Sequence, residues 1–348
     1  MLNDKQILEI KADRIYRFRS PTDYNFKALL ENKIFASTPN VLNDPLDCGI
    51  TYNLHSLYKR LIKKKRFLDY FAYKLFKPDN EKQYDDFDDP NEYFEYSKMV
   101  IEECFIKMLD LNNRNAVEKA IDELSKSIIF ELRDCFGIVS FSLVSGNSVM
   151  WSHYCSNFSG FVLGYDLKSF NDNTNRVVKS YYLTKNHQDF YGLHLVKYES
   201  LDMLTDGTDL MYELITKRIT KKSEIGVKAM LDYALNCKHQ DIFLSLLTTK
   251  DKSWEYEREI RLILPRENYR FNTFKISGNG NAPYFEVAEQ YAPSEIIIGM
   301  NMSKINRAII GYYVLQYPNV LLWEIKDDKM MSERSLYKSL VKPLELLK

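Results

Sequence analysis

The sequence predicts an α+β fold with a mixed, largely antiparallel sheet, two helical insertions and a C-terminal strand–helix–strand unit. Several short segments alternate apolar and polar residues with the two-residue period of strands, and turn residues separate them. Two longer ranges, at about 55–135 and 207–249, carry apolar residues at helical spacing instead. No Gly/Ser-rich linker flanks the first range, so we expect residues 1–348 to form a single domain that contains both insertions.

The N-terminal part of this fold is predicted as strand, helix, strand and loop. Residues 14–19 alternate like a short strand, and the turn at 20–23 can cap a helix that runs to about Leu30. Residues 34–37 form a second short strand. The loop 38–47 is rich in Asn and Asp and contains two prolines, so it is either a rigid structural turn or a pre-shaped ligand loop.

The central part, after the first helical insertion, is predicted to return to the sheet. Residues 136–142 form a strand that ends in a hydroxyl residue, and residues 149–155 form a short helix after a turn. Residues 161–165 form the next strand. Further strands are expected near 176–183 and 194–198, because both stretches contain β-branched or alternating residues.

The C-terminal part contains a predicted hairpin and a strand–helix–strand unit. The hairpin joins residues 270–276 to residues 284–287 through a glycine-containing turn. Residues 295–299 read as a buried strand, Ser303 can cap the helix that follows, and residues 320–325 form the last strand. A strand–helix–strand connection predicts that part of the sheet is parallel.

The stretch 254–265 combines a predicted strand with an unusual set of charges. In its second half, apolar residues occupy one face and Glu257, Glu259 and Arg261 occupy the other. Charges are costly to remove from water unless they are paired or used. Two interpretations stay open: a structural ladder of ion pairs, or one wall of an active site.

Composition limits the classes of function. Lys plus Arg and Asp plus Glu are both 48, so the formal net charge is zero, and it does not predict a nucleic-acid or membrane partner. Whether the basic run 59–66 binds nucleic acid is left open. The five cysteines form no CxxC pair, and their odd number favours a reducing cytoplasm. We expect no signal peptide and no membrane span.

Several common catalytic and metal-binding motifs do not occur. The chain has no GxSxG, HExxH or phosphate-binding Walker sequence, and its five histidines lack metal-ligand spacing, so no metal is expected. His153 and Cys155 lie two residues apart on a predicted helix and point in different directions, which argues against a nucleophilic pair.

Four stretches together resemble the DUF2971 family of uncharacterised, mostly bacterial proteins. They contain the sequences Asn-Asp-Pro-x-Asp, Met-Trp-Ser-His-Tyr and Trp-x-Tyr-Glu-x-Glu-x-Arg, in this order along the chain. They are Ile15–Arg19; Phe35–Pro39 with Leu42–Asp47; Met150–Tyr154 with Gly160; and Lys250 with Trp254–Arg261. The resemblance extends from about residue 14 to 325 and implies no activity by itself. Four such polar, aromatic-rich stretches favour a shared pocket.

A second resemblance, to the ADP-ribosyltransferase fold, implies an activity. In that fold an Arg or His on the first strand grips NAD, hydroxyls of the second strand line the pocket, and a Glu-x-Glu near a late strand carries the catalytic glutamate. The resemblance places Arg17, the pair Ser37-Thr38, and Glu257-x-Glu259 in these roles, with Glu259 catalytic. Pro39 replaces the third hydroxyl of the second strand, and the family pattern assigns no role to the Trp-x-His-Tyr sequence.

The resulting hypothesis is an NAD-using enzyme, an ADP-ribosyltransferase or NAD glycohydrolase, in the cytoplasm. Its expected ligand is a nucleotide, a protein or nucleic-acid acceptor is left open, and the role of a toxin or anti-phage effector is suggested. The alternative is a non-enzymatic ligand-binding sensor or adaptor. The candidate catalytic residues are Glu259 and Glu257, and the candidate cofactor-binding residues are Arg17, Arg19, Ser37, Thr38, Asn43, Asp44, Trp151, His153, Tyr154 and Arg261.

Overall fold

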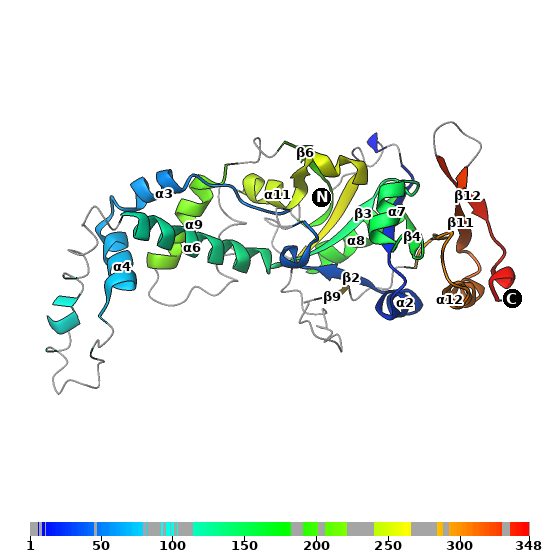
Figure 1. The fold of residues 1–348 in the computed structure, drawn as a ribbon, viewed down its shortest axis with the longest axis horizontal. Helices are drawn as coiled ribbons and strands as arrows, with labels where there is room; N and C mark the ends of the chain where they lie inside the picture. The colour runs from blue at the N-terminus through cyan, green and yellow to red at the C-terminus, as the bar shows by residue number, and fades with distance from the viewer. Residues whose placement is uncertain are drawn as a thin grey trace. The chain divides into compact units, whose positions relative to one another are not determined.

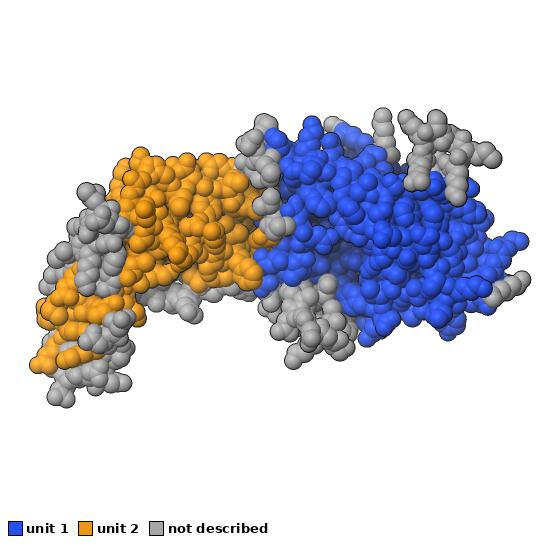
Figure 2. Space-filling view, in the orientation of Figure 1, with its two compact units in different colours: residues 1–48, 134–203, 247–348 blue, residues 49–133, 204–246 orange. Residues whose placement is uncertain are grey.

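The computed structural model describes residues 12–44, 47–78, 114–181, 191–200, 206–220, 240–265, 284–287, 292–328 and 335–347, together with residues 6, 9, 10, 82, 92, 95–97, 99, 100 and 103. The chain groups into two compact units, which Figure 2 colours separately. Unit 1 comprises Met1–Cys48, Asp134–Met203 and Leu247–Lys348, and unit 2 comprises Gly49–Arg133 and Leu204–Leu246. The segments of unit 2 overlap the two ranges expected as helical insertions, and the single-domain assignment stays a prediction.

Unit 1 is built on a mixed, mostly antiparallel sheet, which confirms the predicted α+β class. Six strands follow one another across it in the order β12-β11-β10-β4-β1-β3, and β3 then pairs with both β2 and β8. β9 pairs with β2, and β5 pairs with β8. The strands are β1 Arg14–Arg19, β2 Ile34–Ser37, β3 Phe136–Ser142, β4 Phe161–Asp166, β5 Gly192–Leu195, β8 Glu259–Pro265, β9 Tyr284–Val287, β10 Glu295–Ile298, β11 Leu321–Asp328 and β12 Ser335–Leu340.

The C-terminal strand–helix–strand unit forms as predicted. β10 and β11 are parallel neighbours, and α12, Lys304–Gln316, connects them (Figure 1). The side chain of Ser303 accepts a hydrogen bond from the N–H of Asn306 and so caps the helix. β12, which the sequence did not predict, pairs antiparallel with β11 and ends this path of strands.

The sheet forks at β3. Tyr16 of β1 lies opposite Ser142, and Ser37 of β2 lies opposite Ile138. β8 occupies the other edge of β3 along its whole length, so β1 and β2 must share one edge. β1 and β2 pair with this edge of β3 at positions about 13 Å apart, the length of four residues in a strand. Ser140 lies midway and is exposed, whereas the other six residues of β3 are buried.

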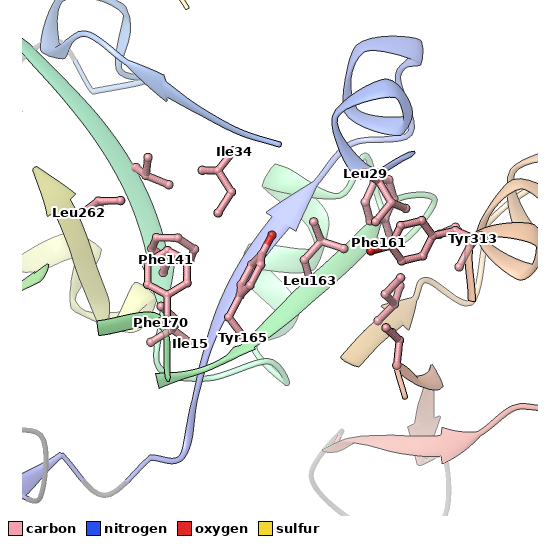
Figure 3. Packing of buried hydrophobic residues seen from close by; sticks show 14 of the residues in the cluster. Ile15, Leu29, Ile34, Phe141, Phe161, Leu163, Tyr165, Phe170, Leu262 and Tyr313 are labelled. Carbon is pink, nitrogen blue, oxygen red and sulfur yellow. The ribbon is translucent and has the colours of Figure 1, made fainter. Parts of the chain in front are cut away.

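Helices cover both faces of this sheet. On one face, α2 (Asp23–Leu30), α8 (Leu167–Tyr181) and α12 pack against strand residues that include Ile15, Leu163 and Leu262 (Figure 3). On the other face, α7 (Ser148–Tyr154) packs against Phe18, Val162 and Ile297 of the strands, among others. The two apolar sets follow from the alternation of side chains along each strand.

One predicted strand is wrong. Residues 176–181, expected as part of a strand, belong to the end of α8. The carboxylate of Asp166 accepts the N–H of Ser169 and starts this helix, and Leu167, Phe170 and Thr174 are buried at helical spacing. Packing of this face outweighs the strand preference of Val177-Val178. The predicted strand over 270–276 lies outside the described residues.

Unit 2 is helical in its described part, as expected for the insertions. Its helices are α3 Leu54–Leu61, α4 Lys65–Phe76, α6 Arg114–Arg133 and α9 Thr208–Thr220, and α11 Gln240–Thr248 begins in this unit. The hydroxyl of Tyr52 donates to Asp122 over 2.7 Å, and Arg60 pairs with Asp209 over 2.5 Å.

Candidate functional site

A cavity of about 270 Å³ lies in unit 1 at the fork between β1, β2 and β3. Eight of the residues selected from the sequence line it: Arg17, Arg19, Ser37, Asn43, Asp44, Tyr154, Glu257 and Glu259. Four do not: Thr38, Trp151, His153 and Arg261. All four stretches that carry the family resemblance thus contribute residues to the lining of one cavity, although they lie far apart along the chain.

The two glutamates stand at a corner rather than along one strand. η5, a 3₁₀ helix over Lys252–Glu257, ends at Glu257, and β8 begins at Glu259. Arg258 between them adopts the left-handed region, with φ 45° and ψ 53°. Its N–H donates to Glu255 over 3.1 Å, and its carbonyl accepts the N–H of Leu143 over 3.0 Å. The expectation that one strand face carries both glutamates is therefore wrong, but the corner still brings both into the cavity.

Glu259 is buried and remains ionised. Arg261 donates to its carboxylate through Nε over 2.8 Å and through Nη2 over 3.1 Å, and Lys250 Nζ lies 3.4 Å away. Ser140 also hydrogen-bonds this carboxylate. Burial alone would raise the pKa of Glu259, but Arg261 and Lys250 outweigh it and hold the pKa at about 2. Glu259 is thus a fixed negative charge in the cavity wall.

Glu257 has the opposite perturbation. Tyr154 donates its hydroxyl to one carboxylate oxygen over 2.5 Å, and Lys250 donates to the other over 2.6 Å. Burial and the charge of Glu259 raise the pKa of Glu257, and the attraction of Lys250 offsets only part of that rise. Two carboxylates whose environments separate their pKa values can take different roles in one reaction.

Arg261 stands behind the cavity wall and joins two of its carboxylates. Besides Glu259 it holds Asp47 in a bidentate pair, with distances of 2.9 and 2.5 Å. Its Nη1 also donates to the carbonyl of Leu247 over 2.8 Å. Nearby negative charges, that of Glu259 foremost, overcome burial and raise the pKa of Arg261 further above its ordinary value. Two cations, Arg261 and Lys250, thus serve three carboxylates in this cluster.

Arg17 offers an unused donor to the cavity. It is 7% exposed, and its Nη2 donates to the carbonyl of Phe35 across the fork over 2.5 Å. Its Nη1 is buried and has no hydrogen-bond partner among the described residues. A buried guanidinium N–H without a partner is costly, so an anionic ligand at this point would satisfy it. The hydroxyl of Thr38, just behind Ser37, is likewise buried without a partner in the described chain.

The aromatic part of the Met-Trp-Ser-His-Tyr sequence serves packing. Trp151 is fully buried, donates its indole N–H to the carbonyl of Ser145 over 2.7 Å and stacks on Phe158 at 5.7 Å. His153 is exposed and is not part of the cavity lining. Of the three residues expected to bind a cofactor here, only Tyr154 reaches the cavity, where Asn43 also hydrogen-bonds its hydroxyl.

Two residues with clear positions in the cluster received no role from the sequence. Lys250 and Asp47 both line the cavity, and both fall inside stretches that carry the family resemblance. Charge balance was the available signal, because two buried glutamates and one arginine leave a negative excess that calls for a further cation. Among the described residues, no group of three or more His, Cys, Asp or Glu is arranged to hold a metal ion.

Comparison with known proteins gives a match of part of the chain to one family model, whose description names no activity. The family described as "Protein of unknown function (DUF2971)" matches residues 150–262. This match confirms the resemblance over the part of the chain that contains most of α7, all of η5 and the first residues of β8. A search of curated proteins and a search of solved structures each found no match. Within the described residues, no helix is both long and apolar enough to cross a membrane.

Proposed function

We propose that the cavity binds NAD and that the protein cleaves the bond between its nicotinamide and ribose, by ADP-ribosyl transfer or by hydrolysis. The observation that carries the proposal is one cavity lined by an ionised, immobilised carboxylate, Glu259, and by Arg17, whose buried Nη1 has no hydrogen-bond partner among the described residues. The first suits a developing positive charge, and the second suits a phosphate.

Glu259 supplies the electrostatic part of the reaction. When the C1′–N bond breaks, its electron pair leaves with nicotinamide, which departs as a neutral molecule, and the ribose ring becomes cationic. Glu259 stabilises that cation and needs no reorganisation, because Arg261 and Lys250 already hold its carboxylate in place.

Glu257 supplies the proton transfer. Water, or a hydroxyl of an acceptor, forms the new bond to C1′ and gives up its proton. The raised pKa of Glu257 suits a proton acceptor that works nearer neutral pH than an ordinary carboxylate. Tyr154 and Lys250 hold its two oxygens and so fix the direction of attack.

The volume of the cavity limits which part of the NAD molecule it can enclose. Pockets that enclose a whole drug-sized ligand measure roughly 300–1,000 Å³. A cavity of about 270 Å³ suits the nicotinamide ribose and the adjoining phosphate, with the adenosine half outside. Arg17 would then bind the first phosphate, next to the reacting ribose.

The test uses the full chain and NAD labelled in its nicotinamide ring. Release of nicotinamide is the readout. Glu259→Gln should lower kcat by about 100-fold or more, because it removes the fixed charge. Arg17→Ala should raise KM by about tenfold or more, the value of one charge-assisted hydrogen bond. Arg14→Ala, on the same strand but outside the cavity lining, is the matched control.

Two results would contradict the proposal in different ways. Undiminished turnover in Glu259→Gln would remove Glu259 from the mechanism. Neither turnover nor NAD binding by the wild-type protein would sink the whole class of NAD-using enzymes.

A second candidate function is ligand binding without catalysis, as in a sensor or adaptor. The favouring observation is that the protein itself occupies every oxygen of Glu257 and Glu259 with hydrogen bonds. In this case Glu259→Gln lowers stability markedly, because Arg261 loses a buried partner. NAD or another anion then binds in calorimetry with no nicotinamide released.

We also propose a cellular compartment and a biological role for the protein. Cys48, Cys135 and Cys155 are buried thiols, which suits a reducing cytoplasm. In the transfer reaction, a protein or a nucleic acid would accept the ADP-ribose. A role as toxin or anti-phage effector follows from the use of NAD, because loss of NAD stops a cell. Expression of the wild type, but not of Glu259→Gln, should then slow growth and deplete cellular NAD.

A further inference from the structure

We infer that Asp47 is a positioning residue, which fixes the carboxylate of Glu259 in the cavity wall by holding the guanidinium of Arg261. The inference deepens the proposed function and rests on it for its catalytic consequence. Asp47 lies in a turn and is buried at 4% exposure. The sequence pattern assigned it no role.

The geometry of Arg261 shows how Asp47 reaches Glu259. Nε donates to Glu259, Nη1 donates to Asp47 and to the carbonyl of Leu247, and Nη2 donates to both Asp47 and Glu259. All five N–H donors of the guanidinium therefore have acceptors. A planar group held on three sides cannot rotate, so the carboxylate that it grips cannot rotate either.

Asp47 can be substituted without changing either glutamate or Arg261, although it also lines the cavity and its carboxylate lies 3.8 Å from Lys250. Leu247 contributes only a backbone carbonyl. Without the carboxylate of Asp47, Nη1 and Nη2 each lose an acceptor in a fully buried site, and the guanidinium gains freedom to turn towards other acceptors. The bidentate grip on Glu259 then weakens.

The remaining groups around Glu259 cannot replace this restraint. Lys250 faces it from β7 (Thr249–Asp251) at 3.4 Å but is shared with Glu257 at 2.6 Å and with Asp47 at 3.8 Å. Ser140 of β3 hydrogen-bonds its carboxylate, and the hydroxyl of Tyr198, from β6 (Lys197–Glu199), accepts its backbone N–H. The charge of Glu257 acts against its ionisation.

The experiment has two independent readouts on Asp47→Asn. The first is the titration of Glu259 itself, followed by ¹³C NMR of glutamate side chains and assigned with Glu259→Gln. The second is nicotinamide release from NAD as a function of pH. Asp172→Asn, an exposed aspartate on α8, is the matched control, and Asp47→Glu tests whether a carboxylate at this position restores function.

The wild-type signal of Glu259 should stay in the ionised form down to about pH 3, in line with its pKa of about 2. In Asp47→Asn it should titrate at higher pH than in the wild type, because loss of the fixed grip of Arg261 outweighs removal of the negative charge of Asp47. The value of kcat should fall by about 10- to 100-fold with KM little changed. The acidic limb of the pH–rate profile should move to higher pH with the titration of Glu259. Asp47→Glu should recover part of both effects, since it keeps the charge.

Each alternative result has a definite meaning. If Glu259 titrates in Asp47→Asn as it does in the wild type and in Asp172→Asn, the positioning role is overturned. If the titration moves while the wild type releases no nicotinamide, the positioning role stands and the proposed reaction fails. If Asp47→Asn does not fold, the same titration of Asp47→Glu decides, because the shifted carboxylate should still move the midpoint upward.

Discussion

Glu257 and Glu259 are separated by a single residue, yet their environments shift their pKa values in opposite directions. The difference comes from Arg261, which donates twice to Glu259 and lies on its side of the corner. Lys250 contacts both carboxylates, so its charge separates their pKa values less than that of Arg261 does. A single guanidinium thus decides which carboxylate is a permanent charge and which can exchange a proton.

The first prediction concerns the acid stability contributed by Glu259. Its folded pKa of about 2 lies below the ordinary 4.5, so its contribution is present above about pH 4.5 and is lost as pH falls towards 2. Between pH 6 and pH 3, linkage gives a loss of roughly 2 kcal/mol. The stability gap between the wild type and Glu259→Gln should shrink by that amount. Urea unfolding followed by circular dichroism at both pH values measures it.

The control for this prediction is Glu255→Gln, the same change at an exposed position of η5. The difference in unfolding free energy between Glu255→Gln and the wild type should stay constant between the two pH values to within about 0.5 kcal/mol. A gap for Glu259→Gln that also stays constant would mean that Arg261 does not hold Glu259 ionised.

At the scale of residues, the sequence predicts the members of the site better than their geometry. The sequence selects Glu257, Glu259 and Arg261, which do meet in one charged cluster, but the two glutamates lie on η5 and β8 rather than on one strand face. It cannot reveal the left-handed turn at Arg258, because nothing in an Arg between two Glu marks a positive φ. Nor can it show that Asp47 pairs with a residue 214 positions away.

Among the elements, the tight junction between α7 and β4 positions Tyr154 beside the cavity. Ser156, Asn157 and Phe158 all have positive φ, at 47°, 52° and 64°, and Phe158 stacks on Trp151. The chain then passes so close to β1 that only a glycine fits at position 160. The Gly160 of the family resemblance is therefore explained by backbone packing rather than by contact with a ligand.

The second prediction follows from that close approach. A Cβ at position 160 would lie 2.0 Å from the carbonyl oxygen of Arg19 and 3.0 Å from Cα of Cys155. Both are backbone atoms, so Gly160→Ala should cost about 3 kcal/mol or more, at the upper end for overpacking, or should prevent folding. Thermal unfolding and expression yield are the measurements.

Gly146→Ala is the matched control, because the nearest atom to its Cβ would be the carbonyl oxygen of Leu336 at 3.9 Å. It should stay within about 0.5 kcal/mol of the wild type. Equal effects of the two substitutions would show that β1 and β4 do not approach as closely as described.

Elements with strong local signals are predicted well, and elements decided by tertiary packing are not. β1, β2, β3 and β10 follow their alternating or apolar runs, and α12 starts at its Ser303 cap. Val177-Val178 favours a strand locally, but the helix that starts at Asp166 continues through it. No local sequence pattern predicts the fork at β3, because the fork depends on which edge of β3 pairs with two strands that are distant in the sequence.

For the whole molecule, ligand binding should stabilise unit 1, which contains the complete lining of the cavity. This third prediction uses an NAD analogue with a non-cleavable carbon link in place of the glycosidic bond. At 100 times its dissociation constant it should add about 2.7 kcal/mol. The transition that includes unit 1 should rise by roughly 5 °C in calorimetry. At the same analogue concentration Arg17→Ala should show about half of that rise, because a tenfold weaker affinity leaves about 1.4 kcal/mol. An equal rise in that variant would place the ligand elsewhere.

The pair between Asp47 and Arg261 has a consequence for synthesis of the chain. The two residues are separated by 214 positions, so the ribosome must add all of them before the pair can close. At 5–20 residues per second this takes roughly 10–40 seconds. For nearly all of that interval the nascent chain carries Arg17 and Ser37 but neither glutamate of the cavity, because Glu257 and Glu259 are added just before Arg261. A chain that stalls or is cut before β8 therefore lacks Glu259 and Arg261, and the charged cluster of the cavity can form only after most of the polypeptide has been made.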